Sequence, residues 1–232
     1  MLARAFCALL VLTACVSCER TRNITVEFYS EDGYRFSQVE RDTIEDIADA
    51  AIPEVRKFLP ALPNELLLKG YPGNDVIPET GESGFTANTD RVFWIVSPAR
   101  AEGIVAIAKR ELRGTLFHEL HHLVRAQTPN SLTLMDRVVG EGLATLFERD
   151  AAAMPAPWGQ YPPNVADWVK ELLALPSDAP WKQWMSRHPD GRRWIGFKAG
   201  TYIADQASRA SGKTAAQLVN EPTAEVLRLA GF

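Results

Sequence analysis

The five residues His118-Glu119-Leu120-His121-His122 constrain this chain more than any other stretch, because they contain the pattern H-E-x-x-H. Four residues make about one helical turn, so the pattern predicts a helix from which His118 and His122 project on one face. Two neutral imidazoles so placed can hold a zinc ion, and Glu119 beside them can act on a zinc-bound water. The chain has 4 histidines, and three of them lie here. This clustering favours a site for one zinc ion per chain over a solvated helix face.

The first 17 residues are typical of an export signal. A short positive segment with Arg4 precedes an unbroken apolar run over 5–12, which is too short to span a bilayer. Residues 12–15, with the sequence LTAC, resemble the lipobox of bacterial lipoproteins, whose cysteine is lipidated and becomes the first mature residue. We therefore expect a signal peptide over 1–14, a lipid anchor on Cys15 and a tether over 15–22. The alternative is an ordinary signal peptide cleaved near the same place.

The residues after Cys15 bear on which membrane holds the anchor. Val16 and Ser17 follow the cysteine, with no aspartate. In lipoproteins this pattern usually accompanies the outer membrane, so we expect a lipid-anchored protein of the bacterial cell envelope, on the periplasmic face of the outer membrane.

Composition sets the remaining limits. All 3 cysteines lie within the first 18 residues, so an exported domain over 23–232 would be held by its own core and not by disulfides. The chain is 46% hydrophobic and 23% charged, with a net charge of -4 and no long basic run. These values fit one globular domain or two closely packed lobes, and they give little support to nucleic-acid binding.

Hydrophobic periodicity places the strands in the first part of the chain, with one helix between the first two, and the other helices afterwards. Turn residues and prolines mark the boundaries between the segments. We expect strands over 23–30, 65–71 and 92–96, and helices over 37–59, 101–127, 132–153 and 194–208, in a region from 165 onward that is all helical. The segment 72–88 has a loop composition, 155–163 is a proline-rich connector, and the glycines around Glu141 are expected to break the helix over 132–153.

This order predicts an α+β fold with a small N-terminal sheet and a mostly helical C-terminal half. It resembles the two-lobed plan of the zincin metallopeptidases, with lobes over about 23–127 and 128–232. In that plan the last strand of the sheet borders the active cleft, where it can bind an extended peptide by backbone hydrogen bonds. The segment 92–96 is either that edge strand or, because its apolar run is continuous, a buried strand.

The third zinc ligand separates the possible classes of metallopeptidase. A metzincin would need glycine at 125 and histidine at 128, where this chain has Arg125 and Thr128. The gluzincin pattern takes a glutamate from the next helix, and Glu141 lies nineteen residues after His122. The helix around Glu141 is apolar on most sides, so a carboxylate there needs a partner, which zinc supplies.

The run Glu-Gly-Leu-Ala at 141–144, after the His-Glu-x-His-His segment, resembles a little-studied bacterial family of predicted zinc-dependent proteases. The resemblance covers about 92–203. It implies a gluzincin-type metallopeptidase that hydrolyses peptide bonds in a peptide or protein substrate. The family also has a Gly-aromatic-x-x-Gly stretch near the site, matched here by 196–200, with Phe197 where tyrosine is common.

Two positions beside the ligands also bear on the site. His121 faces elsewhere on the helix and is expected to be a hydrogen-bonding packing residue. The alternative, that His118 and His121 are the ligands, is disfavoured by the usual register of the motif. Many gluzincins carry an acidic residue four positions after the ligand glutamate, where this chain has Thr145. Glu148, Asp150 or a backbone carbonyl could instead orient a zinc-bound histidine.

The expected mechanism uses Glu119 as the general base that accepts a proton from the zinc-bound water and delivers it to the leaving amine. A second electrophile normally stabilises the oxyanion. The candidates are Tyr202 on a helix and His188 in a polar loop, with Arg193 behind them.

Other functions stay open. The chain could be a non-catalytic periplasmic binding or assembly lipoprotein with a structural zinc, although a structural site has no use for a base such as Glu119. It could also be an amidase that acts on cell-wall peptides. Five tryptophans in the second half are expected in the core or at an interface, or else form a stacking platform. They are Trp158, Trp168, Trp181, Trp184 and Trp194.

Overall fold

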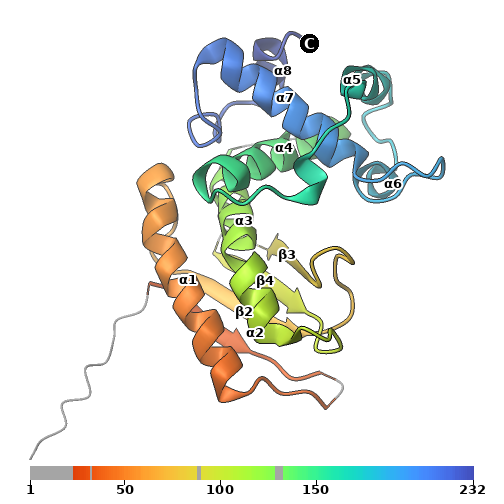
Figure 1. Cartoon of the computed structure of the whole chain (residues 1–232). Helices are drawn as coiled ribbons and strands as arrows, with labels where there is room; N and C mark the ends of the chain where they lie inside the picture. Colours follow the sequence, from red (N-terminus) through yellow and green to blue (C-terminus); the bar gives the residue numbers. More distant parts are fainter. Residues whose placement is uncertain (1–22, 32, 88–89, 129–132) are drawn as a thin grey trace, which may run out of the picture.

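The strands lie in the N-terminal part of the chain, with one helix between the first two, and the other helices follow, as the sequence predicted (Figure 1). The computed structural model describes residues 23–31, 33–87, 90–128 and 133–232. The expected signal peptide, tether and lipid-modified Cys15 lie outside the described residues. The described part confirms the α+β class, with a small mixed sheet and a helical C-terminal half.

The sheet has four strands in the order β1-β2-β4-β3. They are β1 (Thr25–Phe28), β2 (Leu67–Pro72), β3 (Glu82–Ala87) and β4 (Arg91–Val96). β1, β2 and β4 run parallel, and β3 is antiparallel to β4. The segment 92–96 is therefore an interior strand. Of the two alternatives that the sequence left open, the edge strand is wrong and the strand inside the sheet is confirmed.

The edge strand is β3, which lies within the segment 72–88 that the sequence predicted to be a loop. Its sequence ESGFTA contains small and polar residues and lacks the β-branched alternation that predicts a strand. Its pairing with β4, from Glu82 opposite Val96 to Ala87 opposite Arg91, holds it in the sheet. Tertiary pairing overrides weak local propensity here.

One face of the sheet forms the core of the N-terminal half. Alternate side chains of β2 and β4 are buried, including Leu68, Val92 and Trp94, while their neighbours are partly exposed. Helix α1 (Gln38–Phe58) and the helical run over 103–125 lie along this sheet (Figure 1). A capping box of Ser37 and Glu40 fixes the start of α1.

The helix expected over 101–127 is a run of three segments. They are α2 (Gly103–Ile107), a π-helical turn (Ala108–Leu112) and α3 (Arg113–Arg125). A π-helical turn inside a helix frequently lies near a functional site. Here it directly precedes the helix that carries the histidines.

The C-terminal half is helical, as expected. It contains α4 (Leu134–Ala151), a 3-10 turn (Pro157–Gly159), α5 (Val165–Leu173), α6 (Trp181–Met185), α7 (Ile195–Ser211) and α8 (Thr223–Leu229). The predicted break in α4 around Glu141 is absent, and the helix is continuous. The glycines instead let another helix approach closely, since a Cβ on Gly142 would fall 2.0 Å from the carbonyl carbon of Gly200 in α7.

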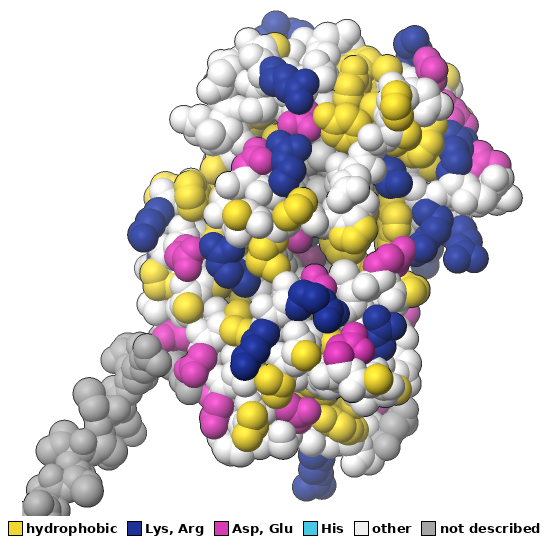
Figure 2. Space-filling view, in the orientation of Figure 1, with side chains coloured by type: hydrophobic (Ala, Val, Ile, Leu, Met, Phe, Trp, Pro, Cys, Tyr) yellow, Lys and Arg dark blue, Asp and Glu magenta, His cyan; other side chains and the backbone are white. Residues whose placement is uncertain are grey.

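The surface seen in Figure 2 mixes charges of both signs, with hydrophobic side chains gathered in its upper part. Figure 1 shows that this part consists of the C-terminal helices. Among the described residues no helix combines the length and the apolar character that crossing a membrane requires.

Candidate metal centre

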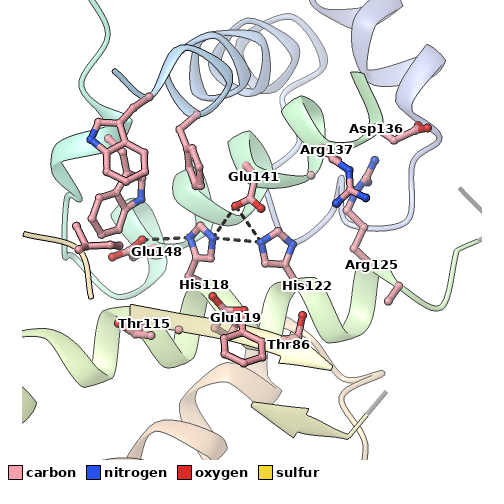
Figure 3. A pocket seen from close by; sticks show the side chains of 18 of the residues that line it. Thr86, Thr115, His118, Glu119, His122, Arg125, Asp136, Arg137, Glu141 and Glu148 are labelled. Atoms are coloured by element: carbon pink, nitrogen blue, oxygen red, sulfur yellow. Dashed lines mark hydrogen bonds and ion pairs between the residues drawn. The ribbon is translucent and has the colours of Figure 1, made fainter. Parts of the chain in front are cut away.

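α3 presents His118 and His122 toward α4, as the four-residue spacing predicted (Figure 3). The Nε2 atoms of His118 and His122 are 3.1 Å apart, and the Oε2 atom of Glu141 lies 3.1 Å and 3.2 Å from them. Among the described residues these three form the group whose side chains could hold a metal ion.

This triangle fits zinc. Ligand atoms about 2.0–2.1 Å from a tetrahedral zinc ion are about 3.3–3.4 Å apart, close to the three separations observed here. Two imidazole nitrogens and one carboxylate are also the donor set of a catalytic zinc site with a free fourth position. Without a proton or a cation among them, the lone pairs of the two imidazoles and the carboxylate would repel each other.

The two imidazoles and the surrounding carboxylates shift one another's ionisation. Burial disfavours the charged form of His118, but contacts with Glu141 and Glu148 outweigh it and raise the pKa of His118. Burial likewise opposes ionisation of Glu141, yet the two imidazoles hold its pKa well below the usual range. A carboxylate that stays ionised while buried is suited to bind a cation.

Of the two acidic candidates for orienting a ligand histidine, Glu148 is the one that lies beside the candidate ligand His118. Its Oε2 atom lies 3.3 Å from Nδ1 of His118, and both atoms are buried with no hydrogen-bond partner among the described residues. Asp150, the other acidic candidate, instead pairs with Arg149 on the surface. Thr145, at the position where gluzincins carry an acidic residue, is buried with an unpartnered hydroxyl.

The candidate base Glu119 lies on the side of α3 that faces the sheet (Figure 3). It is 6% exposed, lines the cleft and makes no side-chain hydrogen bond to another described residue. Burial raises the pKa of Glu119, which makes its carboxylate a stronger base than an exposed one.

The edge strand β3 crosses directly over Glu119. A Cβ on Gly84 would lie 2.4 Å from Cγ2 of Thr115 and 3.1 Å from Cγ of Glu119. Only glycine allows so close an approach of the strand to the helix. No sequence pattern singled out Gly84, because the segment was predicted to be a loop.

A cleft of about 510 Å³ joins these groups. Its walls are the edge strand, α3, α4 and an aromatic group from the C-terminal half, namely Trp158, Trp181, Trp194 and Phe197. Phe197 lies with its ring centroid 6.4 Å from that of His118, so the Gly-aromatic-x-x-Gly stretch does approach the site. Trp184, in contrast, belongs to the core.

The structure does not bring either proposed oxyanion partner to the cleft. The Tyr202 ring packs against Tyr161 and Phe232 on another side of α7. His188 lies against Trp184, with Nδ1 2.9 Å from Oδ2 of Asp190. Neither side chain lines the cleft.

Two further expectations concern side chains beside the site. Arg193 pairs with Glu79 and does not line the cleft. His121 is fully buried, with Nε2 3.4 Å from the carbonyl oxygen of Ala215 and its ring against Phe147, which is a packing position.

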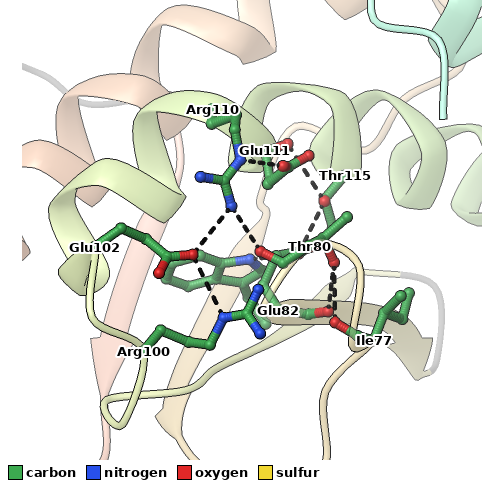
Figure 4. Close-up of polar contacts among 9 residues, drawn as sticks. Ile77, Thr80, Glu82, Arg100, Glu102, Arg110, Glu111 and Thr115 are labelled. Atoms are coloured by element: carbon green, nitrogen blue, oxygen red, sulfur yellow. Dashed lines mark hydrogen bonds and ion pairs between the residues drawn. The ribbon is translucent and has the colours of Figure 1, made fainter. Parts of the chain in front are cut away.

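A buried glutamate in the wall of the cleft was not predicted from the sequence. Oε2 of Glu82, at the start of β3, accepts hydrogen bonds from Nε1 of Trp94 at 2.7 Å and from Oγ1 of Thr115 at 3.0 Å (Figure 4). Burial raises the pKa of Glu82 to about 7, against the effect of these two donors. Had β3 been recognised as a strand from the sequence, the alternation of its side chains would have placed Glu82 on the buried face of the sheet.

The geometry agrees with a comparison to protein families. The family model described as "Predicted Zn-dependent protease (DUF2268)" matches residues 44–228. The chain belongs to this family. The match confirms the resemblance drawn from the two motifs and extends it over most of the chain. No curated protein and no solved structure gave a match.

Proposed function

We propose that this protein is a zinc-dependent metallopeptidase of the gluzincin type. The observation that carries the proposal is the triangle of His118, His122 and Glu141 with Glu119 beside it in an open cleft. A zinc ion held there would supply Lewis acidity that brings the pKa of water to about 7 and polarises a carbonyl group. A purely structural site would need neither the cleft nor the base.

The chain's own residues would perform the proton transfers and position the substrate. A carboxylate oxygen of Glu119 would accept a proton from the attacking water and pass it to the leaving amine. Glu148 would hold the His118 ring through Nδ1, and thereby keep Nε2 directed at the cleft. The open edge of β3, at Gly84 to Thr86, would pair with the backbone of an extended peptide.

The test compares wild type with Glu119→Gln, whose amide cannot take up the proton. We expect one zinc per chain in both proteins, and a fall in turnover of about 100- to 10,000-fold in the variant. Glu102→Gln, an exposed change at the start of α2, serves as the matched control and keeps wild-type turnover.

Three results would contradict the peptidase. One is equal turnover of wild type and Glu119→Gln. Another is zinc binding without hydrolysis of any peptide, which would favour the binding lipoprotein with a structural zinc. Cleavage of cell-wall peptides but not of protein substrates such as casein would favour the amidase.

We also propose that Cys15 carries a lipid anchor that holds the enzyme at the periplasmic face of the bacterial outer membrane. The support is the lipobox-like run over 12–15 and the residues after it. Cys15→Ser should release the protein from the membrane fraction or stall its processing. Unchanged fractionation and unchanged gel mobility would refute the anchor.

A further inference from the structure

An arginine stands one helical turn before the candidate ligand Glu141. Arg137 and Glu141 are four residues apart on α4, so their side chains leave the same face of the helix. Both line the cleft, and in Figure 3 Arg137 lies on the side of Glu141 and His122 that faces away from His118. A substrate bound at the candidate metal centre would therefore pass close to this guanidinium.

The guanidinium of Arg137 has an aromatic partner but no hydrogen-bond acceptor among the described residues. Its Cζ lies 4.4 Å from the ring centroid of Trp181. Within the described residues no carboxylate pairs with Arg137, and its Nε is buried without a hydrogen-bond partner. A buried donor without an acceptor is unfavourable, so a group outside the described chain is needed to satisfy it.

The second arginine of the cleft provides a contrast. Arg125 donates hydrogen bonds to the carbonyl oxygens of Val219 and Glu221 and to the hydroxyl of Thr223. These bonds tie the end of α3 to the C-terminal segment, so Arg125 has a structural role. Among the described residues that line the cleft, Arg137 is the cation left to bind an incoming group.

We infer that Arg137 anchors a carboxylate of the peptide substrate, an inference that rests on the proposed peptidase function. A guanidinium binds a carboxylate through two parallel N–H···O bonds, and a stacked ring such as Trp181 keeps its plane in position. The carboxylates of the lining, including Glu82, Glu119 and Glu148, would repel an anion, and the guanidinium of Arg125 is engaged in its own hydrogen bonds. A substrate carboxylate is therefore favoured at Arg137 over the parts of the cleft beside these glutamates.

Two parts of a peptide carry this group, namely its C-terminus and an aspartate or glutamate side chain. Binding is measured by calorimetry on the full-length, zinc-loaded Glu119→Gln protein, which does not consume the peptide. One peptide pair differs by a free or amidated C-terminus, and a second pair differs by glutamate or glutamine at each position in turn. We expect one acid form to bind about 10- to 100-fold more tightly than its amide.

Arg137→Gln in the same protein should reduce this preference to less than about 3-fold, and Arg137→Lys should retain part of it as a point charge. Arg41→Gln is the matched control, because Arg41 also stacks on a ring, that of Phe28, but lies outside the cleft. It should leave the preference unchanged. Melting curves establish that each variant is folded.

Equal binding of acid and amide in both pairs would overturn the inference, as would a preference that survives in folded Arg137→Gln. Hydrolysis of the same peptides by the protein with Glu119 intact separates the two proposals. Cleavage without a carboxylate preference would support the peptidase function and overturn the proposed role of Arg137. A carboxylate preference that depends on Arg137, without any cleavage, would support carboxylate binding by Arg137 and contradict the peptidase function.

Discussion

The backbones of Gly142 and Gly200 touch where α4 crosses α7. A Cβ on Gly142 would lie 2.0 Å from the carbonyl carbon of Gly200, and one on Gly200 would lie 2.0 Å from the carbonyl oxygen of Val138. Gly142 directly follows Glu141, so this crossing fixes the height and rotation of the candidate third ligand. The C-terminal helices thereby hold part of the metal centre in place.

We expect Gly142→Ala to destabilise the fold by about 3 kcal/mol, because rigid backbone atoms cannot move away from the added methyl group. Zinc affinity should fall with it. Gly140→Ala is the control on the other side of Glu141, since its Cβ would meet only the Arg125 side chain at 3.7 Å. Urea unfolding of both variants tests this, and equal stability of the two would contradict it.

Gly84→Ala should lower turnover by about 10-fold or more while zinc content stays unchanged. The added methyl group would displace Glu119 and Thr115, and small displacements of a catalytic group are costly. Thr115→Ser in the same chain removes the nearest methyl group, keeps the hydroxyl that binds Glu82, and should restore part of the turnover. Ser83→Ala, whose side chain lies outside the cleft, is the control. Normal turnover in Gly84→Ala would show that the strand does not position Glu119.

Glu148→Gln should weaken zinc binding by about 10- to 100-fold, because the His118 ring loses its carboxylate partner. Competition with a chelator measures the affinity. Asp150→Asn, two residues away on the surface, should bind zinc as wild type does. Equal zinc affinities of the two variants would show that Glu148 does not contribute to zinc binding.

Glu82 should make stability depend on pH. Its pKa is about 7 in the folded protein, whereas a glutamate in the unfolded chain has its ordinary value of 4.5, so between these values the folded state binds more protons than the unfolded state. The free energy of unfolding should therefore fall as pH rises from about 5 to 8, by up to about 3 kcal/mol from this group. Glu82→Gln should remove that fall. Parallel curves of unfolding free energy against pH for the two proteins would contradict it.

Local spacing was enough to predict the central part of the site. His118 and His122 share a helix face because the helical repeat places every fourth residue there, and Glu119 follows from the same motif. Glu141 could be found because the gluzincin pattern takes the third ligand from the next helix, and because a carboxylate in an apolar helix requires a partner. The α+β order also followed from hydrophobic periodicity, since strand and helix repeats differ.

Contacts between distant segments decided the rest. β3 becomes an edge strand only through its pairing with β4, Glu148 meets His118 only because α3 packs on α4, and Arg137 faces Trp181 across two helices. Tyr202 and His188 carry suitable groups, but the packing of the C-terminal helices directs them away from the cleft. The sequence by itself determined which chemistry the metal-binding helix can support, because that depends on residues within one turn. Tertiary structure determined the walls of the cleft, because they depend on long-range packing that no local pattern encodes.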